Sequence, residues 1–372
     1  MPGPPLKRTP LYDRHVEAGA RMVDFVGWEM PLLYRGILEE HRHTRTAASI
    51  FDISHMGRIE IRGRDAGAML EYVCTRRVGD MQPGQCRYSH VCGESGGILD
   101  DVIISRYDDR WLLVCNACNH ARITAWLAGN ALGRDVQLDD ITDRTAMIAV
   151  QGPGTMAQAA ARVPVPLSDL RRYRFRTGTY LGMPFTVFRT GYTGEDGMEV
   201  IVPASAASVV WMFLTQPHDD FEPPTVQPAG LGARDTLRIE AGLPLYGHEL
   251  HEHVDPITAG FAWCVDLEKD FCGAAAVRAV AQEGPARKLV GLELAGRRIA
   301  RQHGTVRSGG RVVGEVTSGT FAPTLGRSIA MAYVEVGHDC PGTSLAVQIG
   351  EHEEPATVVA LPFYRRDRGT RA

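Results

Sequence analysis

The sequence predicts an α+β fold with a separate small β-barrel or sandwich at its C-terminal end. At 372 residues the chain is longer than one hydrophobic core usually supports, so we expect two or three domains. Between residues 57 and 283, strand-like and helix-like segments mix without a strict βαβ repeat, which favours α+β over a doubly wound parallel sheet. Beyond Gly284-Pro285 the chain reads as short β runs separated by Gly/Pro turns, as in a small barrel.

The individual elements follow from the spacing of apolar residues along the chain. Alternation of polar and apolar residues predicts a strand over 58–62, and continuous apolar runs predict buried strands over 111–115 and 146–151. A charged helix is expected over 36–48, after a short strand or turn region. The other expected helices are 66–74, 121–132, 155–162, 205–215 and 231–242. The other expected strands are 179–189, 198–203, 289–294, 310–316, 328–336, 344–349 and 356–360.

Composition argues against several classes of protein. A net charge of −4 provides no global field for nucleic acid or an anionic membrane, and no window approaches 18 continuous apolar residues. We therefore expect no transmembrane helix, and the opening Met-Pro-Gly-Pro-Pro-Leu-Lys-Arg has no apolar region typical of a leader. Eight cysteines are too sparse for a disulfide scaffold. Several lie in apolar segments, which predicts reduced cysteines and a cytoplasmic location: Cys74, Cys92, Cys115 and Cys264.

Two adjacent carboxylates, Asp100 and Asp101, lie inside an apolar β run that follows Gly96-Gly97. Because side chains alternate along a strand, Asp100 shares one face with Ile98 and Val102, and Asp101 lies on the opposite, also apolar face. A buried carboxylate is costly unless it is paired or its pKa shifts. The segment leaves both interpretations open: a structural pair, or an acid kept for chemistry.

A glycine-rich loop over 189–197 places Glu195 directly after a glycine. Three glycines allow the backbone to approach a ligand closely or to adopt positive φ, and this carboxylate could accept two parallel N–H bonds, as a pterin ring presents them. The alternative, which the residues alone favour, is a hairpin turn with an exposed acid.

Three other segments give weaker signals. Arg234 and Arg238 lie one turn apart on a helix that opens with Gly-x-Gly, but the third glycine of a dinucleotide fingerprint is missing, and an ordinary surface helix explains them equally well. The run 248–255 has several histidines but not zincin spacing, so we interpret it as a solvated loop. Cys115 and Cys118 have no second pair to complete a metal site, and Met56 alone is typical of core packing.

Taken in order, these segments resemble the aminomethyltransferase (T-protein) family of the glycine cleavage system, over nearly the full chain. The motifs that carry the resemblance are Thr9-Pro10-Leu11-Tyr12, Phe25-Val26-Gly27-Trp28, Phe51–Met56, Gly96–Asp101, Val150-Gln151-Gly152-Pro153, Gly191–Gly197, Gly230–Arg238 and Val316–Gly326. The resemblance implies a three-domain cloverleaf around a central folate channel, with a C-terminal β-barrel. Its domains would be 1–50 plus 141–283 (folate-binding, discontinuous), 51–140 (an inserted α+β folate-binding subdomain) and 286–372 (the barrel).

The resemblance also implies the site residues. Asp100 would be the catalytic acid group, Glu195 and Arg234 would bind the folate, and Tyr364 matches a C-terminal contact. The residues implied to line the pocket are Met56, Tyr88 and Asn116. A carboxylate near a developing iminium-type cation can stabilise its charge or assist proton transfer at folate N5/N10, and the sequence does not choose between the two tasks.

The implied reaction moves the methylene carbon of S-aminomethyldihydrolipoyl H-protein to tetrahydrofolate and releases ammonia. Tetrahydrofolate would be the co-substrate, with neither metal nor nucleotide. The implied partner is lipoylated H-protein. The resemblance also implies that this protein is a monomer and that it contacts H-protein and the other components of the system transiently. Two alternatives remain: a tetrahydrofolate-dependent demethylase on the same fold, and a non-enzymatic folate-binding assembly factor.

Overall fold

The computed structural model describes residues 5–217 and 226–366. The chain forms two compact units, each built from three stretches of sequence. The first unit comprises Met1–Ala66, Met81–Arg87 and Ile103–Asp235, and the second comprises Gly67–Asp80, Tyr88–Val102 and Thr236–Ala372. None of the helices in the described ranges could span a membrane.

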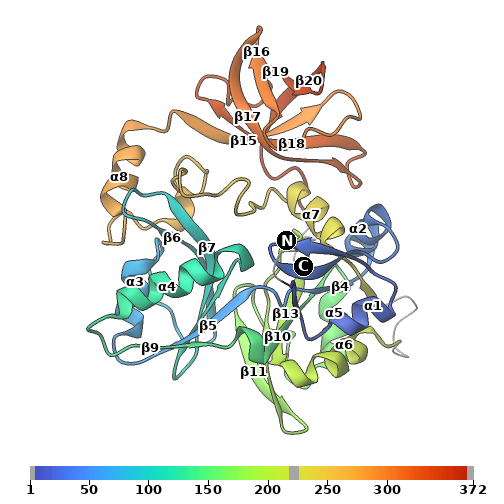
Figure 1. Ribbon diagram of the computed structural model, residues 1–372, viewed down its shortest axis with the longest axis vertical. Helices are drawn as coiled ribbons and strands as arrows, with labels where there is room; N and C mark the ends of the chain where they lie inside the picture. The colour runs from blue at the N-terminus through green and yellow to red at the C-terminus, as the bar shows by residue number, and fades with distance from the viewer. Residues whose placement is uncertain (1–4, 218–225, 367–372) are drawn as a thin grey trace. The chain divides into compact units, whose positions relative to one another are not determined.

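A six-stranded sheet forms the centre of the first unit (Figure 1). Strand β10 lies between β13 and β4, and its residues 146–151, apolar up to Val150, are all buried. Helices α5 and α6 pack against this sheet through Ala159, Ala207 and Trp211, which belong to its core. The strands, in spatial order, are β11 (Phe175–Tyr180), β12 (Met183–Phe188), β13 (Gly197–Pro203), β10 (Thr145–Gln151), β4 (Ser49–Asp52) and β14 (Gln227–Pro228).

Two smaller sheets follow, and strands β6 and β7 of one of them run from one unit into the other. A three-stranded sheet of order β1-β3-β2 follows the N-terminal end of the described chain. In a five-stranded sheet of order β6-β7-β8-β5-β9, β8 pairs with both β5 and the second half of β7. Their bounds are β1 (Lys7–Arg8), β2 (Arg21–Phe25), β3 (Trp28–Leu33), β5 (Gly57–Arg62), β6 (Gln85–Cys92), β7 (Ile98–Arg106), β8 (Trp111–Cys115) and β9 (Gln137–Asp140).

The helices of the chain are short. Those of the first unit are α1 (Tyr12–Glu17), α2 (Ile37–Thr46), α4 (His120–Ala131), α5 (Thr155–Arg162), α6 (Ala207–Thr215), η1 (Ala117–Asn119), η2 (Thr142–Arg144) and η3 (Ala204–Ala206). The second unit holds α8 (Ala274–Glu283), η4 (Ala262–Cys264) and all but the first residue of α3 (Ala66–Val73). Helix α7 (Leu231–Glu240) runs from the first unit into the second.

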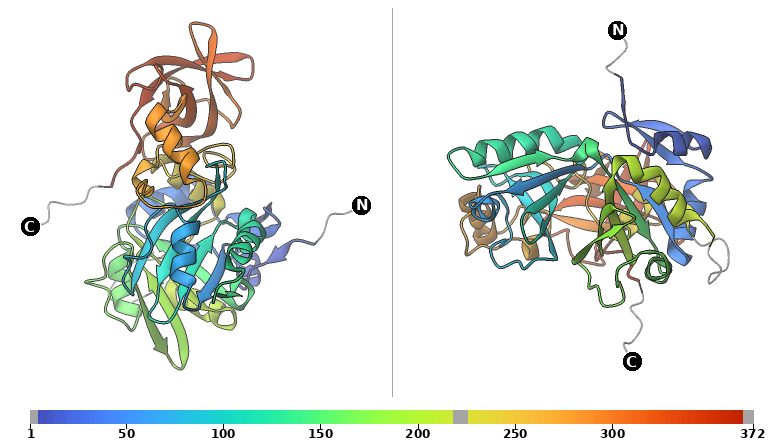
Figure 2. Two further views of the ribbon diagram at one scale, coloured as in Figure 1. Left: turned by 90° about the vertical axis from the view of Figure 1, so that its left-hand side faces the viewer. Right: turned by 90° about the horizontal axis from the view of Figure 1, so that it is seen from below.

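The second unit contains a closed six-stranded barrel, drawn in orange and red in Figure 2. Aliphatic residues from all six strands fill its interior, because alternate side chains of each strand point inward. The strands follow the order β15 (Arg287–Leu294), β18 (Arg327–Glu335), β17 (Arg311–Ala322), β16 (Thr305–Ser308), β19 (Ser344–Ile349) and β20 (His352–Val359).

The predicted fold class, α+β with a C-terminal β-barrel, is confirmed. Strand β17 extends six residues beyond the predicted 310–316, because residues 318–322 continue the ladder with β18. Strand β16, whose four residues shift register midway, was not predicted. The predicted domain bounds stay a prediction, and their outer ends, residues 1–4 and 367–372, lie outside the described chain.

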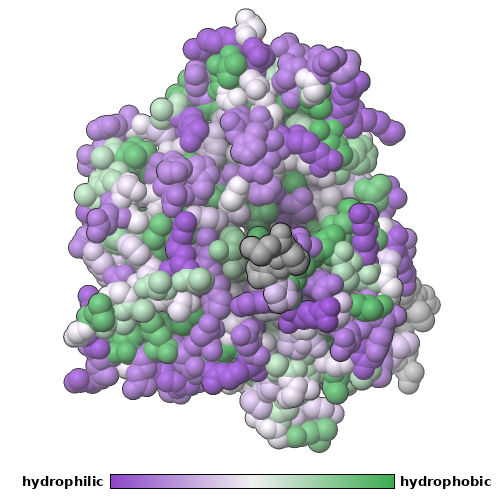
Figure 3. Space-filling view, viewed as in Figure 1, coloured by the Kyte–Doolittle hydropathy of each residue, from purple (hydrophilic) through white to green (hydrophobic). Residues whose placement is uncertain are grey.

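Polar residues dominate the molecular face shown in Figure 3, and apolar ones occur there in small groups. The exposed apolar side chains include Leu132 and Leu181, which are 82% and 91% exposed and lie at turns. Single exposed apolar residues are ordinary on protein surfaces. The surface charge is mixed rather than uniformly basic, in line with the net charge of −4.

Candidate functional site

Glu195 lies in the loop between β12 and β13, and its carboxylate is buried. The side chain is 3% exposed, and Arg45 on α2 donates from Nη1 to its Oε1 at 2.9 Å. The same Nη1 donates to the main-chain oxygen of Thr193 at 2.7 Å. The alternative interpretation, a hairpin turn with an exposed acid, is therefore wrong. Nothing in the sequence indicates Arg45, because a basic residue on a charged helix gives no sign of the loop it faces.

Two glycines of this loop are required by the side chain of Gln151. A Cβ at Gly191 would lie 1.9 Å from Oε1 of Gln151, and one at Gly197 would lie 2.2 Å from its Nε2. The amide is buried and bonded: Nε2 donates to the oxygen of Thr190 at 3.1 Å, and Oε1 accepts from Thr193 Oγ1 at 3.0 Å. These two glycines therefore make room for the Gln151 side chain, and Gly194, the third glycine of the loop, has a positive φ of 84°.

Arg234, on α7, is partly buried, and its guanidinium lies over the ring of Tyr192, 4.7 Å from the ring centroid. Among the residues described, Nη1 of Arg234 has no hydrogen-bond partner although it is buried. Burial also lowers the pKa of Arg234. A buried charged donor without an acceptor costs free energy, so this N–H is suited to an acceptor on a ligand. The interpretation of α7 as an ordinary surface helix is wrong at this position.

Two titratable groups near Arg234 were not predicted as site residues. Burial, and then the charge of Arg234, lowers the pKa of His55 to about 3, so this imidazole is neutral at neutral pH. In the part of the chain that the structure describes, its Nδ1 is buried without a hydrogen-bond partner. Burial raises the pKa of Glu199, while Thr190 Oγ1 donates to its Oε2 at 2.5 Å and Arg234 lowers it through charge. The only sequence signal for His55 is its place beside Met56.

Met56 and Asn116 lie at the same end of the paired strands β5 and β8. Gly57 and Cys115 are partners in this antiparallel ladder, so the residue before β5 and the residue after β8 come next to each other. The packing is tight here, because a Cβ at Gly57 would lie 2.5 Å from Cys115 Sγ and 2.7 Å from His120 Cδ2. The ladder thus brings together two residues that the resemblance places in the folate pocket.

Asp100 lies in β7 and is completely buried, with 0% of its surface exposed. Ile98 and Val102, on the same face of the strand, are buried as well, as the alternation predicts. Asp101 is partly exposed. The start of the strand is fixed within the second unit, since Ile98 N donates to the oxygen of Val254 at 2.9 Å. A Cβ at Gly97 would lie 1.8 Å from the oxygen of Glu252, which explains this glycine.

Tyr88 belongs to an aromatic cluster of the second unit. Its hydroxyl hydrogen-bonds to Nε2 of His90 at 3.1 Å, and its ring stacks on Trp263 with centroids 5.8 Å apart. The Trp263 residue is 58% exposed, and the guanidinium of Arg76 lies 5.6 Å from its ring centroid. Tyr88 is therefore held by a stacked and hydrogen-bonded environment rather than by core packing alone.

Tyr364 lies beyond the last barrel strand and is partly buried. Its N–H donates to the oxygen of Glu240, the last residue of α7, at 2.7 Å. Oε1 of Glu240 in turn accepts from the N–H of Thr324 at 2.9 Å, in the Val316–Gly326 motif. The C-terminal segment, the end of α7 and this motif are thus connected within the second unit.

The run 248–255, expected to be a solvated loop, is buried in part: Glu252 and His253 are exposed, but Glu249 is not. Glu249 is completely buried and accepts from Arg238 Nη1 at 2.8 Å and from Thr317 Oγ1 at 2.6 Å. The main-chain oxygen of Glu249 also accepts a hydrogen bond from the Tyr333 hydroxyl at 2.7 Å. Arg238 and Glu249 therefore tie α7 to the barrel, so Arg238 has a structural role in the second unit.

The predicted residues divide between the two units. The first unit holds Glu195 and Arg234, with Tyr192 of the Glu195 loop lying under the Arg234 guanidinium, and it holds Met56 and Asn116 at one ladder end. The second unit holds Tyr88, Asp100 and Tyr364. A cavity of about 530 Å³ lies elsewhere in the first unit, against Trp211 and Met212 of α6, and its lining includes none of the predicted residues within the described ranges.

Comparisons with known proteins cover almost the whole chain. Residues 11–269 match the GCVT N-terminal domain, and residues 287–365 match the glycine cleavage T-protein C-terminal barrel domain. The chain is 46% identical to an aminomethyltransferase of Rubrobacter xylanophilus over 98% of this chain and 95% of that protein. It is 44% identical to one of Streptomyces coelicolor, over 98% and 99%. The crystal structure of the glycine cleavage system aminomethyltransferase T from Bartonella henselae superposes with a TM-score of 0.90 and 36% identity, over 96% of this chain and 98% of that one.

Proposed function

Because the chain belongs to the aminomethyltransferase (T-protein) family of the glycine cleavage system, a family of transferases, we propose that it uses tetrahydrofolate and H-protein. The methylene carbon of S-aminomethyldihydrolipoyl H-protein passes to tetrahydrofolate, 5,10-methylenetetrahydrofolate forms, and ammonia is released. Chemically, the site must bind a flat heterocycle with both donors and acceptors and must stabilise a transient cation beside a sulfur-bound carbon.

The observation that carries this proposal is that one loop holds the buried carboxylate of Glu195 and the Tyr192 ring over which the Arg234 guanidinium lies. Glu195 ends in a carboxylate suited to the N3–H and 2-amino donors of a pterin. Arg234 has the buried Nη1 without a hydrogen-bond partner among the described residues, and it lies over Tyr192 of the same loop. The residues fit the folate because one group accepts and the other donates, in a site where neither is well solvated.

Met56 and Asn116 supply a second part of the same pocket. They flank the paired residues Gly57 and Cys115 of the β5–β8 ladder. His55, directly before Met56, has its pKa lowered by burial and by the charge of Arg234. A neutral His55 adds no second positive charge beside Arg234. We assign Met56 and Asn116 to the walls of the folate pocket. Tyr88 and Tyr364 are assigned to folate binding on the family resemblance.

Asp100 is the residue we assign to the chemical step. Complete burial among Ile98 and Val102 keeps water away from this carboxylate, and a fixed anion in such a place stabilises a developing iminium-type cation far better than water does. The same carboxylate can hold or move a proton as the folate ring closes between N5 and N10. Either task requires the carboxylate itself, so loss of the charge should abolish most turnover.

Three further points belong to the proposal. The protein works as a monomer in the cytoplasm and meets lipoylated H-protein and the other components of the system transiently. The domain bounds stated above are part of the same proposal. Neither metal nor nucleotide takes part.

The decisive experiment is turnover of aminomethyl-loaded H-protein with and without tetrahydrofolate, with ammonia and methylenetetrahydrofolate measured separately. We expect rapid release of ammonia, in equal amounts with methylenetetrahydrofolate, only when tetrahydrofolate is present. A demethylase would instead act on small methylated sulfur or aryl ether donors. A folate-binding assembly factor would bind tetrahydrofolate and turn over neither donor.

A further inference from the structure

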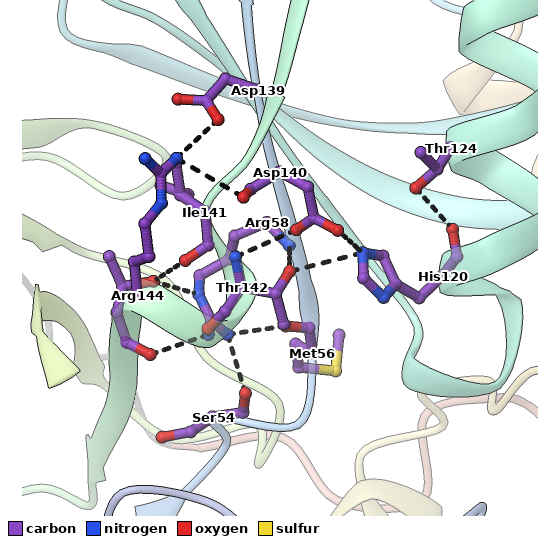
Figure 4. Close-up of polar contacts among 11 residues, drawn as sticks. Ser54, Met56, Arg58, His120, Thr124, Asp139, Asp140, Ile141, Thr142 and Arg144 are labelled. Carbon is purple, nitrogen blue, oxygen red and sulfur yellow. Dashed lines mark hydrogen bonds and ion pairs between the residues drawn. The ribbon is translucent and has the colours of Figure 1, made fainter.

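Arg58, two residues after Met56, has a completely buried side chain whose five N–H donors all have acceptors (Figure 4). Nη1 donates to the main-chain oxygens of Ser54 at 3.0 Å and Met56 at 2.6 Å. Nη2 donates to the main-chain oxygens of Thr142 at 2.5 Å and Thr145 at 3.1 Å. Nε donates to Thr145 Oγ1 at 2.8 Å.

These hydrogen bonds join two separate segments of the first unit. Ser54 and Met56 belong to the turn between β4 and β5, whereas Thr142 and Thr145 belong to η2 and the start of β10. Bonds from a charged donor are stronger than those between neutral groups, so the guanidinium acts as a clamp between the two segments. Burial lowers the pKa of Arg58 to about 10, so the clamp stays charged at neutral pH.

The main chain of Met56 is held from both sides. Its oxygen accepts from Arg58, and its N–H donates to the oxygen of Ile53 at 3.1 Å. The next residue, Gly57, has no room to shift toward Cys115, because even a Cβ would lie 2.5 Å from Sγ. Arg58 itself is anchored a second time, since its N–H donates to Thr142 Oγ1 at 2.9 Å. Arg58 therefore contacts the Met56 main chain directly, and the neighbouring hydrogen bonds and packing leave that main chain little freedom to move.

We propose that Arg58 is a positioning residue for folate: it holds the Met56 carbonyl and thereby fixes where the Met56 side chain stands in the pocket. The inference rests on the proposed function only for the contact between Met56 and folate. If packing alone were at stake, an apolar residue would fill this position at lower cost, since burying a charge is expensive. One of the acceptors of the Arg58 guanidinium is the main-chain oxygen of Met56, a residue assigned to the folate pocket.

A double-mutant cycle tests the inference, with the dissociation constant for tetrahydrofolate as the readout. Arg58→Lys keeps the charge but has only three donors in place of the planar fork. We expect it to weaken tetrahydrofolate binding by about fivefold to tenfold in the parent protein, and by less than about twofold when Met56→Ala is also present. Equal weakening in both backgrounds would show that Arg58 does not act through Met56, and an unchanged dissociation constant would also overturn the proposal.

Arg162→Lys is the matched control. Arg162 is another buried arginine of the first unit, and it donates to Gln158 Oε1 and to the oxygen of Gln216, on the side of α5 and α6. We expect it to lower the melting temperature about as much as Arg58→Lys while leaving the dissociation constant unchanged. A comparable loss of binding in Arg162→Lys would mean that Arg58 acts only through general stability.

A milder variant keeps the test informative if Arg58→Lys fails to fold. Thr145→Ala removes the acceptor of Nε and loosens the clamp at the end away from Met56. It should weaken tetrahydrofolate binding in the same direction by a smaller factor, again only when Met56 is present, and unchanged binding would count against the clamp. A parent protein that does not bind tetrahydrofolate would refute the proposed function, which separates that failure from a failure of the positioning role.

Discussion

Arg45 donates from Nη1 to Glu195 Oε1 at 2.9 Å, and the two side chains are only 6% and 3% exposed. Removing one partner of such a buried pair leaves an uncompensated charge, which costs far more than the pair contributes as a whole. The carboxylate proposed to bind the pterin is therefore also held by a cation from α2. Substitutions at Glu195 must consequently be judged on folate affinity and on stability separately.

Glu195→Ala should weaken tetrahydrofolate binding by roughly 2–4 kcal/mol, the usual loss for one partner of a buried charge-assisted bond. It should also destabilise the fold by about 3–5 kcal/mol, because Arg45 loses its partner. Calorimetric titration and denaturant unfolding measure the two effects. Arg45→Met is the matched control, since it breaks the same ion pair but keeps the carboxylate, so stability should fall similarly and affinity much less. Unchanged affinity in Glu195→Ala would leave Glu195 only as the partner of Arg45.

Arg234→Met should weaken tetrahydrofolate binding while leaving the free energy of unfolding almost unchanged. Nη1 of Arg234 is buried and lacks a hydrogen-bond partner among the described residues, so an apolar replacement should leave the free energy of unfolding within about 1 kcal/mol of the parent. Tetrahydrofolate binding should fall by roughly 1.5–3 kcal/mol, the range for a hydrogen bond to a charged group. Arg162→Met, which removes a bonded arginine, should instead lower stability. A large loss of stability in Arg234→Met would mean that the protein itself uses this donor.

The helices and strands could be predicted from the sequence wherever the spacing of apolar residues clearly matched one type of element. The apolar run of β8 and the alanine-rich helix α5 were predicted with the bounds that the structure has, because neither has a competing signal. Strand β16 could not, since its four residues have no clear alternation and its register shifts midway.

Site residues were harder to predict from the residues alone, because burial depends on partners far away in the sequence. Glu195 reads as an exposed turn residue until Arg45, 150 positions earlier, is brought to it by α2. Glu249 reads as part of a solvated loop until Arg238 and Thr317 surround it. Asp100 differs, because the alternation along its own strand already predicts a buried carboxylate, and the structure confirms the burial.

Asp100→Asn should keep the fold and tetrahydrofolate binding but lose most turnover. Asparagine has nearly the same shape, so the packing around β7 survives while the charge is removed. An interaction made mainly in the transition state lowers kcat with little change in ground-state binding. Steady-state kinetics with aminomethyl-loaded H-protein measure this effect. Asp101→Asn is the control and should matter less, and the reverse order would identify Asp101 as the acid.

His55 predicts a specific loss of stability in mild acid. Burial, and then the charge of Arg234, lowers its pKa to about 3, below the ordinary 6.5, so the unfolded chain binds more protons than the folded one between these values. Stability should therefore fall as the pH drops from about 6.5 toward 3, by about 1.4 kcal/mol per pH unit for one group. His55→Phe, packed beside Phe25, should reduce this slope by that amount, as denaturant unfolding between pH 7 and pH 4.5 can show.

His90 is the matched comparison for this measurement. Burial lowers its pKa to about 3 as well, and it lies in the second unit, in the aromatic cluster around Tyr88. His90→Phe should reduce the slope by a similar amount, but without the charge of Arg234 as a contributor. An acid dependence that neither variant alters would show that other groups dominate the response.

The last prediction concerns the surface that H-protein approaches. Arg171 and Arg172 belong to a basic run with Arg174 and Arg176, and both are exposed. Family resemblance implies an acidic lipoyl partner, so we expect the two exposed arginines to steer it, and exposed charges mainly change association rate and salt dependence. Replacing both with Gln should raise KM for H-protein at low salt and leave tetrahydrofolate affinity unchanged. Gln at Arg122 and Arg134, also exposed on the first unit, makes the same change in net charge and is the control. If KM and its salt dependence match the parent, H-protein docks on another surface.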